Sequence, residues 1–245
     1  MTFNNRTAVI TGAAGRIGRA TAEIFAKHGI KLFLTDINME KLDEVAEQLK
    51  KINPDIHTVY MDVSDKESIE KASSEILSKA DKVDILVNNA GAWPRSSALD
   101  CSDEDWQSVI NLNLHSVFRL SKIFGEKMKA QQYGRIINLA SIAGEVGLPG
   151  LCGYSTSKAA VLMLTKTMAM ELAKSGVTVN AVSPGLIQDE KRANPGTWIG
   201  RTGTGDEVAN AIIFLAADES GYITGIDIPV DGGRTLGPLT TSYKG

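Results

Sequence analysis

"TAVITGAAGRIGRATAEIFAK" (residues 7–27) decides the fold, because an apolar run, a glycine-rich turn and a helical pattern follow one another there without a gap. The run 7–11 is short, β-branched and almost wholly apolar, which is typical of a strand buried on both faces. From residue 16 the apolar residues return at helical spacing and predict a helix over 16–28. A strand that passes straight into a helix through such a turn is typical of a parallel α/β sheet.

The same alternation of strand and helix continues along the chain. Further strands are predicted over 31–35, 57–61, 84–88, 135–139, 178–182 and 226–230. Further helices are predicted over 39–51, 65–79, 103–130, 153–174 and 206–217. No linker or repeat interrupts the pattern, so we expect residues 1–245 to form a single domain. The expected fold is an α/β, Rossmann-like doubly wound parallel sheet of about seven strands, in the order 3-2-1-4-5-6-7, with helices on both faces.

The composition argues against nucleic-acid, membrane and metal partners. The chain has 245 residues, of which 43% are hydrophobic, and its formal net charge is -3 with no basic block. It contains no apolar stretch of bilayer-spanning length, and it does not begin with a signal-peptide pattern. Its two cysteines are too few for a disulfide framework, and its three histidines share no metal-binding spacing. We therefore expect a cytoplasmic protein with free thiols and no bound metal.

The first turn has the features of a dinucleotide site. The backbone N–H groups of a turn that contains Gly12, Gly15 and Gly18 can hold a pyrophosphate at the N-terminus of the following helix. Asp36 ends the second predicted strand, where a carboxylate can bind the ribose hydroxyls of NAD and repel the extra phosphate of NADP. Arg16 could hold the pyrophosphate or, turned outward, the 2′-phosphate of NADP. We expect NAD as cofactor, with NADP as the alternative.

A second stretch, "GYSTSKAAV" (153–161), places Tyr154 and Lys158 four residues apart at the start of an apolar helical run. The two side chains are then neighbours, one turn apart on one helix face. Any two residues with this spacing are neighbours on a helix, so coincidence is the alternative to a functional pair.

A set of short motifs resolves this choice, because their order and spacing resemble the short-chain dehydrogenase/reductase family. The motifs are "TGAAGRIG" (11–18), "MDV" (61–63), "NNAG" (88–91), "NLNL" (111–114), "NLASIAG" (138–144), "YSTSK" (154–158), "SPG" (183–185) and "VDGG" (230–233). The resemblance covers nearly the whole chain. It implies an NAD(P)-dependent oxidoreductase that interconverts a secondary alcohol and a ketone by hydride transfer.

The resemblance also implies a catalytic set, which maps onto Asn113, Ser141, Tyr154 and Lys158. Tyr154 would act as general acid and base, Ser141 would hold the substrate oxygen, and Asn113 would fix a water that relays the proton. Lys158 would bind the nicotinamide ribose and lower the pKa of Tyr154, which is otherwise about 10. Asn111 competes with Asn113 for the first role, and the position of Asn113 relative to Trp106 favours Asn113.

The cofactor contacts implied by the resemblance follow the strands, with Asp62 at the adenine ring and "NNAG" bracing the sheet behind the cofactor. The full set is Gly12, Gly15, Arg16, Ile17, Gly18, Asp36, Ile37, Asp62, Val63, Asn89, Ala90, Gly91, Tyr154, Lys158, Pro184, Gly185 and Ile187. Trp93 and Trp198 are candidate substrate contacts because they follow strands, with local packing as the alternative. Glu145 is a candidate for recognition of substrate charge, with a solvated loop as the alternative.

The chain departs from the family pattern in two places. Arg16 stands where the second glycine is usual, and the resulting glycine spacing is similar to that of the extended branch of sugar-nucleotide epimerases and dehydratases. Those enzymes carry a sizeable C-terminal substrate domain, whereas this chain ends soon after its last predicted strand. In the motif "PG-x-I-x-T", Asp189 replaces the usual threonine, and residues 186–205 form only a short substrate lid. A short lid predicts an open site for a bulky or extended substrate.

The helix after Tyr154 is apolar around more of its circumference than one sheet-facing stripe requires. By resemblance its second face packs on a partner, so we expect a homotetramer built as a dimer of dimers. Residues 234–245 form a C-terminal tail that either crosses a subunit interface or is disordered. Two alternatives to the oxidoreductase remain: an epimerase or dehydratase of the extended branch, and a non-catalytic NAD-sensing module.

Overall fold

The computed structural model describes residues 1–3 and 5–237, so most of the expected tail over 234–245 lies outside the described residues. Its centre is a parallel seven-stranded sheet in the order β3-β2-β1-β4-β5-β6-β7, which confirms the predicted topology. The strands are β1 (Thr7–Thr11), β2 (Lys31–Asp36), β3 (Ile56–Tyr60), β4 (Ile85–Asn88), β5 (Gly134–Leu139), β6 (Val177–Pro184) and β7 (Asp227–Val230). The strand order reverses between β1 and β4, where a doubly wound sheet binds its ligand.

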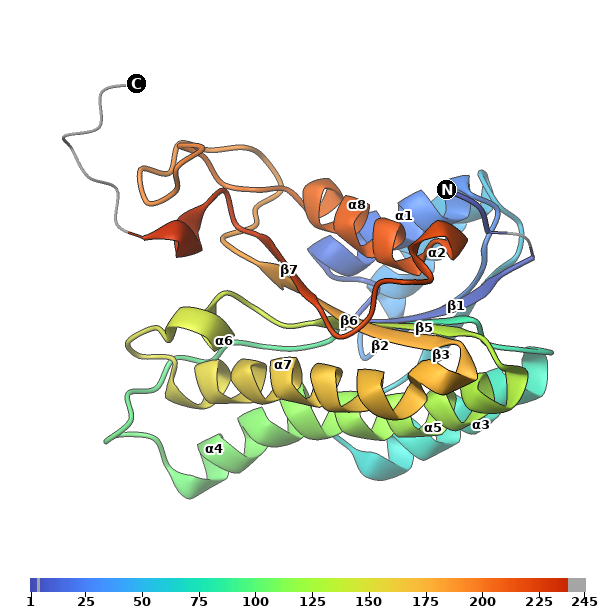
Figure 1. Cartoon of the computed structure of the whole chain (residues 1–245), viewed down its shortest axis with the longest axis horizontal. Helices are drawn as coiled ribbons and strands as arrows, with labels where there is room; N and C mark the ends of the chain where they lie inside the picture. The colour runs from blue at the N-terminus through green and yellow to red at the C-terminus, as the bar shows by residue number, and fades with distance from the viewer. Residues whose placement is uncertain (4, 238–245) are drawn as a thin grey trace.

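Helices cover both faces of this sheet (Figure 1). One layer consists of α1 (Arg16–Lys27), α2 (Met39–Lys50) and α8 (Gly205–Ala216). The other layer consists of α3 (Lys66–Lys79), α4 (Asp103–Ile110), α5 (Ser116–Gln131) and α7 (Cys152–Leu172). A separate hydrophobic cluster fills the space between the sheet and each layer.

Polar side chains cap several helices at the residues where the chain leaves a strand or loop. Asn38, Asp65 and Ser102 each accept a hydrogen bond from a first-turn backbone N–H, at the starts of α2, α3 and α4. Such caps satisfy N–H groups that have no partner inside the helix. Helix α1 differs, because its N-cap is Gly15 and no side chain caps it. The N-terminus that faces the glycine turn is therefore left without an internal cap.

The predicted helix over 103–130 is wrong in one respect, because the structure divides it. A π-turn over Asn111–His115 separates α4 from α5. The wider turn inserts residues that rotate the following side chains, and π-turns are frequent at functional sites. The structure also contains a short helix that the sequence did not predict, α6 (Ala143–Val146), which is too short to produce a periodic pattern.

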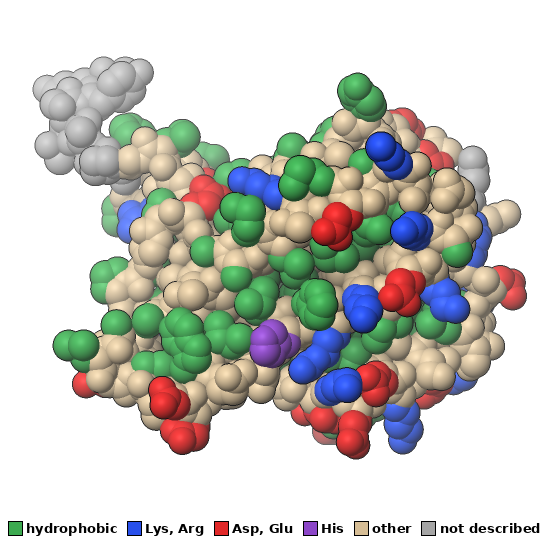
Figure 2. All heavy atoms as spheres, turned by 60° about the horizontal axis from the view of Figure 1, so that its bottom comes forward, with side chains coloured by type: hydrophobic (Ala, Val, Ile, Leu, Met, Phe, Trp, Pro, Cys, Tyr) green, Lys and Arg blue, Asp and Glu red, His purple; other side chains and the backbone are tan. Residues whose placement is uncertain are grey.

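The face formed by α3, α4, α5 and α7 is divided in character. Figure 2 shows hydrophobic side chains gathered over one part of it and mixed acidic and basic side chains over the rest. Phe118 on α5, and Met163 and Met170 on α7, are exposed. Large apolar side chains on α5 and α7 are thus accessible to solvent.

The described residues contain no candidate membrane span, no candidate metal site and no disulfide. None of their helices has the length and apolar character needed to cross a membrane. They contain no cluster of three or more His, Cys, Asp or Glu side chains suited to a metal ion. Cys101 and Cys152 are both free thiols, as the sequence predicted.

Candidate active site

The glycine turn lies at the carboxyl end of β1 and is held by the end of β4. Gly12 has a φ of 63°, a left-handed conformation that favours glycine. Asn89 Nδ2 donates hydrogen bonds to the carbonyl oxygens of Thr11 and Gly12, at 2.8 and 3.0 Å. A methyl group at Gly18 would come within 2.3 Å of Gly12 O, so the turn packs directly on α1. The turn is therefore a rigid loop that ends at an uncapped helix N-terminus.

Asp36 lies beside this turn, at the end of β2. Its Oδ2 accepts a hydrogen bond from Ala14 N at 3.0 Å, and its Oδ1 accepts one from Asn38 N at 3.0 Å. These two hydrogen bonds fix the Asp36 carboxylate at the carboxyl end of β2. Helix α2 is capped by Asn38 and not by Asp36, because the Asn38 side chain accepts a hydrogen bond from Lys41 N.

The next predicted cofactor residues follow β3 and β4. Asp62 Oδ1 accepts hydrogen bonds from both N and Oγ of Ser64, while the Val63 side chain is buried. Asn88 Nδ2 donates to Asn138 Oδ1 at 2.8 Å, which ties β4 to β5. The "NNAG" segment thus braces the centre of the sheet and carries Gly91 toward the catalytic candidates.

Lys158 is the most unusual charged residue of this region, because its side chain is wholly buried. Its Nζ donates a hydrogen bond to Leu139 O at 2.6 Å, and it forms no salt bridge with any described residue. Burial lowers the pKa of Lys158 from 10.5 to about 8. A buried ammonium without an acidic partner is a feature of functional sites rather than of structural ion pairs.

Tyr154 lies one helical turn earlier on α7, and Lys158 Nζ is 5.8 Å from its ring centre. Burial raises the pKa of Tyr154, while a hydrogen bond with the Ser141 side chain acts in the opposite direction. This net direction is opposite to the expected lowering by Lys158, because desolvation of the buried phenol is the largest cause of the shift. In the chain alone Tyr154 is therefore a neutral phenol at neutral pH.

Ser141 and Asn113 complete the group. Ser141 follows β5 and accepts a hydrogen bond from Ala143 N at 3.1 Å. Asn113 lies in the π-turn, where its Nδ2 donates to Ala92 O at 2.8 Å and its Oδ1 accepts from Ala92 N at 3.1 Å. A methyl group at Gly91 would lie 2.7 Å from Asn113 Oδ1 and 3.6 Å from Lys158 Nζ, so these two side chains meet at Gly91. Asn113, rather than Asn111, lies next to Lys158.

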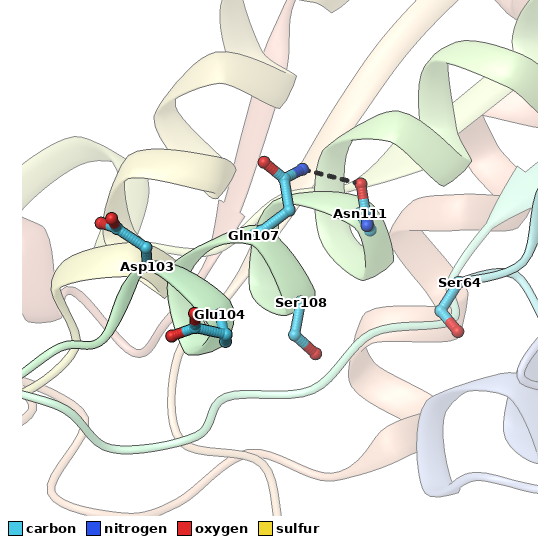
Figure 3. A pocket seen from close by; sticks show the side chains of 6 residues that line it. All are labelled: Ser64, Asp103, Glu104, Gln107, Ser108 and Asn111. Carbon is cyan, nitrogen blue, oxygen red and sulfur yellow. Dashed lines mark hydrogen bonds between the residues drawn. The ribbon is translucent and has the colours of Figure 1, made fainter.

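Asn111 belongs to a different, shallow hollow of about 570 Å³, whose other lining residues are Ser64, Asp103, Glu104, Gln107 and Ser108. Figure 3 shows Gln107 and Asn111 turned toward one another, joined by a hydrogen bond of 2.9 Å from Gln107 Nε2 to Asn111 Oδ1. His115 Nδ1 also lies 2.9 Å from the same oxygen. The side-chain oxygen of Asn111 is thus hydrogen-bonded to the neighbouring side chains of Gln107 and His115.

The three candidate substrate residues lie in different surroundings. Trp93 is 65% exposed. Its loop is joined to the segment just before Tyr154 by a β-bridge between Ser96 and Leu151. Trp198 is 42% exposed and packs on Gly233. Glu145 lines a separate hollow of about 290 Å³ with Lys166 and Asp227, and none of the catalytic candidates lines that hollow. Its position in α6 directs Glu145 toward β7, and its contact with the substrate stays a prediction.

The sequence did not predict the contact that crosses from the glycine turn to the segment after β6. Arg16 Nε and Nη2 donate to the two carboxylate oxygens of Asp189, at 2.9 and 3.0 Å, and Nη1 donates to Ile187 O at 3.0 Å. The two charged residues are 173 positions apart, and no local pattern joins them. Both had been singled out as departures from the family pattern, which was the only indication available.

The comparisons with known proteins agree with this arrangement. A family model described as enoyl-(acyl carrier protein) reductase matches residues 12–235. The 3-oxoacyl-[acyl-carrier-protein] reductase FabG of Thermotoga maritima is 37% identical to this chain, over 96% of it and 100% of the relative. The dehydrogenase/reductase SDR family member 6 of Rattus norvegicus is 38% identical, over 96% of this chain and 99% of the relative. The chain belongs to the short-chain dehydrogenase/reductase family.

Solved structures support the same assignment. The acetoin dehydrogenase YohF of Salmonella typhimurium superposes with a TM-score of 0.92 at 30% identity, and the match covers 98% of this chain and 100% of that one. Membership of the short-chain dehydrogenase/reductase family makes this chain an NAD(P)-dependent oxidoreductase, as the sequence predicted.

Proposed function

We propose that this short-chain dehydrogenase/reductase interconverts a ketone and a secondary alcohol, with Tyr154 as the proton donor and acceptor. The observation that carries the proposal is the group formed by the Tyr154 phenol, its hydrogen-bond partner Ser141 and the unpaired, buried Lys158 ammonium. Lys158 and Asn113 meet at Gly91, which follows β4 at the same carboxyl edge of the sheet as the glycine turn. A dinucleotide and a carbonyl substrate can therefore meet there.

The glycine turn fits the diphosphate of a dinucleotide. Helix α1 has no acidic residue in its first turn and no side-chain cap, so its N–H groups and dipole favour an anion. Asp36 would hold the ribose of the adenosine half, and Lys158 would hold the nicotinamide ribose. When bound, the cofactor supplies or accepts the hydride.

The chain's own residues would handle the proton. In the reducing direction Ser141 holds the carbonyl oxygen, and the neutral Tyr154 phenol donates its proton to that oxygen as negative charge develops. The Lys158 ammonium stabilises the resulting phenolate. The side-chain amide of Asn113 makes two hydrogen bonds with the backbone of Ala92. Its oxygen and its nitrogen each retain one further hydrogen-bonding position, which a water of the proton relay would fill. Oxidation reverses these steps.

We propose NAD as the preferred cofactor, because the Asp36 carboxylate is held by two backbone N–H groups at the position of the adenosine ribose. A fixed anion there repels the 2′-phosphate of NADP. One structural neighbour, YwfH, is described as an NADPH-dependent reductase at 26% identity, so NADP is the alternative that the test must include. Asp36→Ser should shift the ratio of NADH to NADPH binding toward NADPH, and an unchanged ratio would contradict the assignment.

A homotetramer is proposed from the helical face described above. Phe118, Met163 and Met170 are exposed on α5 and α7, where Figure 2 shows hydrophobic side chains gathered. Contiguous exposed apolar surface of this kind marks an interface. Light scattering at micromolar concentration should give a tetramer's mass, and a monomer's mass would contradict the proposal. The cytoplasmic location stays a prediction.

Residues 186–205 are proposed as the substrate lid. Their two sides pair, through Ile187 with Gly203 and Ala193 with Arg201, and the tip contacts the turn after β7 where Ile199 N donates to Gly232 O. Such a short, self-paired segment suits a bulky or extended substrate. Trp198, within the lid, and Trp93, after β4, would contact the substrate. The relatives' names suggest 3-oxoacyl thioesters and hydroxy ketones as the first compounds to test.

The direct test is the near-ultraviolet absorbance of NADH and NADPH with purified protein and a panel of 3-oxoacyl thioesters, hydroxy ketones and sugar acids. The panel is run with the wild type and with Tyr154→Phe. Turnover by the wild type and its loss in the variant would support the proposal. Binding of NADH without turnover of any compound would favour the sensing module, and turnover by Tyr154→Phe at the wild-type rate would overturn the role of Tyr154.

A further inference from the structure

Two carboxylates flank the glycine turn, and each accepts hydrogen bonds from a residue at the turn. On the side of β2, Asp36 accepts the N–H of Ala14. On the side of β6, Asp189 accepts two guanidinium N–H groups of Arg16, the first residue of α1. Arg16 is therefore directed away from Asp36, toward the segment that follows β6. This geometry does not favour a contact between Arg16 and a 2′-phosphate on the Asp36 side.

The Arg16–Asp189 contact spans the region where the diphosphate is expected. Arg16 begins the helix whose N-terminus faces the turn, and its third hydrogen bond goes to Ile187 O, within the proposed lid. A methyl group at Gly205 would lie 2.8 Å from Arg16 O, so the start of α8 packs on the same helix end. The guanidinium thus joins the turn to the chain after β6 across the opening of the site.

The pair is strong in geometry and yet accessible. The two parallel N–H···O bonds form the bidentate arrangement that arginine prefers with carboxylates and with phosphates alike. The Arg16 side chain is 37% exposed and that of Asp189 is 65% exposed. Arg19 lies farther away, with Nη2 3.9 Å from Asp189 Oδ1. A diphosphate offers Arg16 the same acceptor geometry with a larger charge, so exchange of partner is favourable.

We propose that Asp189 is an internal counter-ion for Arg16, which the diphosphate of the dinucleotide replaces when the cofactor binds. Asp189 then lowers the affinity for the cofactor and speeds its release. This inference rests on the proposed dinucleotide function and assigns the residues that set the strength of binding. The proposal explains why the two departures from the family pattern occur together: the arginine in the glycine turn is balanced by an aspartate in place of the usual threonine.

The test is a binding measurement that needs no substrate. Dissociation constants for NADH and NADPH are measured by fluorescence, and that for ADP-ribose by calorimetry, on the full-length protein. Asp189→Asn should tighten all three ligands by roughly threefold to tenfold, because Arg16 is released for the shared diphosphate. Arg16→Gln should weaken all three, and adding Asp189→Asn to Arg16→Gln should change affinity by less than about twofold. NADH release, followed by stopped-flow, should slow in Asp189→Asn.

Two controls define the result. Glu47→Gln removes the same charge from an exposed ion pair with Lys50 on α2, and it should leave affinity unchanged. Asp189→Thr, which restores the family's usual residue, should tighten binding as Asp189→Asn does. Because Asp189 is exposed, neither substitution threatens folding, which thermal melting verifies.

Four outcomes would overturn the inference. Asp189→Asn could leave affinity unchanged or weaken it. The tightening could persist without Arg16, it could affect NADPH alone, or Glu47→Gln could reproduce it. If the wild type binds none of the three ligands, the proposed function fails as well; if it binds them and Asp189→Asn has no effect, only the counter-ion role fails.

Discussion

The two ends of the sheet both bury charge, but they treat it differently. At the amino ends of the strands, Asp84 is 1% exposed and accepts a hydrogen bond from Thr7 N, with Arg6 and Lys82 at 3.2 and 3.3 Å. Arg6 also reaches Asp218 at 2.8 Å, and this carboxylate accepts the Tyr133 hydroxyl hydrogen bond. Every charge in that cluster faces an opposite charge.

At the carboxyl ends, Lys158 is also buried, with 4% of its surface exposed, and among the described residues its one hydrogen bond goes to the Leu139 carbonyl oxygen. The causes of the shifted pKa values at the two ends of the sheet differ in the same way. Burial alone lowers the pKa of Lys158 to about 8, whereas at the amino end burial of Tyr133 and its bond to Asp218 both raise the pKa of a tyrosine that has no chemical task. A shifted pKa does not by itself indicate function. The absence of a fixed counter-charge, among the described residues, is what distinguishes the carboxyl end.

The largest expected effect comes from removing the proton donor at the carboxyl end. Tyr154→Phe should lower turnover by about 10³-fold or more, because no other group can protonate the substrate oxygen. NADH affinity and melting temperature should stay close to those of the wild type, since the substitution removes only the hydroxyl and keeps the ring. Steady-state kinetics, a fluorescence titration and thermal melting measure the three quantities, and a variant that fails to bind NADH would assign Tyr154 to binding instead.

The matching change at the amino end should have the opposite profile. Asp84→Asn leaves Arg6 and Lys82 without their shared carboxylate and should lower the free energy of unfolding by about 3 kcal/mol. Turnover at a temperature where the variant is folded should be unchanged. Urea denaturation monitored by circular dichroism tests this, and a stable variant with impaired turnover would end the division between the two ends.

The pH dependence of ketone reduction should report the unpaired ammonium. The folded-state pKa of Lys158, about 8, lies below its ordinary 10.5, so its charge is present below pH 8 and is lost above it. The pKa of Tyr154 is raised, so the phenol keeps its proton over this range. The value of kcat/KM for reduction should therefore fall by about tenfold per pH unit above 8. A profile that stays level to pH 10 would show that Lys158 has a partner in solution.

The smallest effect is expected at one paired site within the carboxyl half. Glu207 accepts bonds from Arg201 at 2.7 and 3.0 Å and caps α8 through Thr204 N, which lowers its pKa to about 2. Glu207→Gln should lower the free energy of unfolding by about 1 kcal/mol. A depressed carboxyl pKa stabilises the fold above its ordinary value of 4.5 and ceases to do so as the pH falls toward 2.

The melting temperatures of the wild type and Glu207→Gln should therefore converge as the pH is lowered from 5 toward 2. If the gap is independent of pH, the contribution of Glu207 does not come from its charge.

Much of this molecule could be predicted from short-range patterns. The strand runs, the helical periods and the glycine turn are local features, and together they predicted the sheet order. The choice of Ser141, Tyr154 and Lys158 came from the resemblance to the short-chain dehydrogenase/reductase family, and their roles stay a prediction. The division of the helix over 103–130 was not predictable, because a π-turn inserts a residue without interrupting the apolar pattern.

The remaining differences arise from contacts between distant parts of the chain. The pair Arg16 and Asp189 joins two loops that only the folded sheet brings together. The direction of Glu145 could not be predicted, because a helix of four residues has no periodicity from which to infer it. The direction of the Tyr154 pKa was wrong because the spacing to Lys158 predicted proximity but not the depth of burial.

The most direct test of the account is transfer of a labelled hydride. Purified protein is incubated with a ketone identified in the panel and with NADH carrying deuterium at the transferable position of the nicotinamide, and the products are analysed by mass spectrometry. The account predicts one deuterium on the carbinol carbon for each NADH oxidised, and none above background with Tyr154→Phe. Label that remains on the cofactor, with no net oxidation while the substrate is altered, would contradict the oxidoreductase and favour an epimerase.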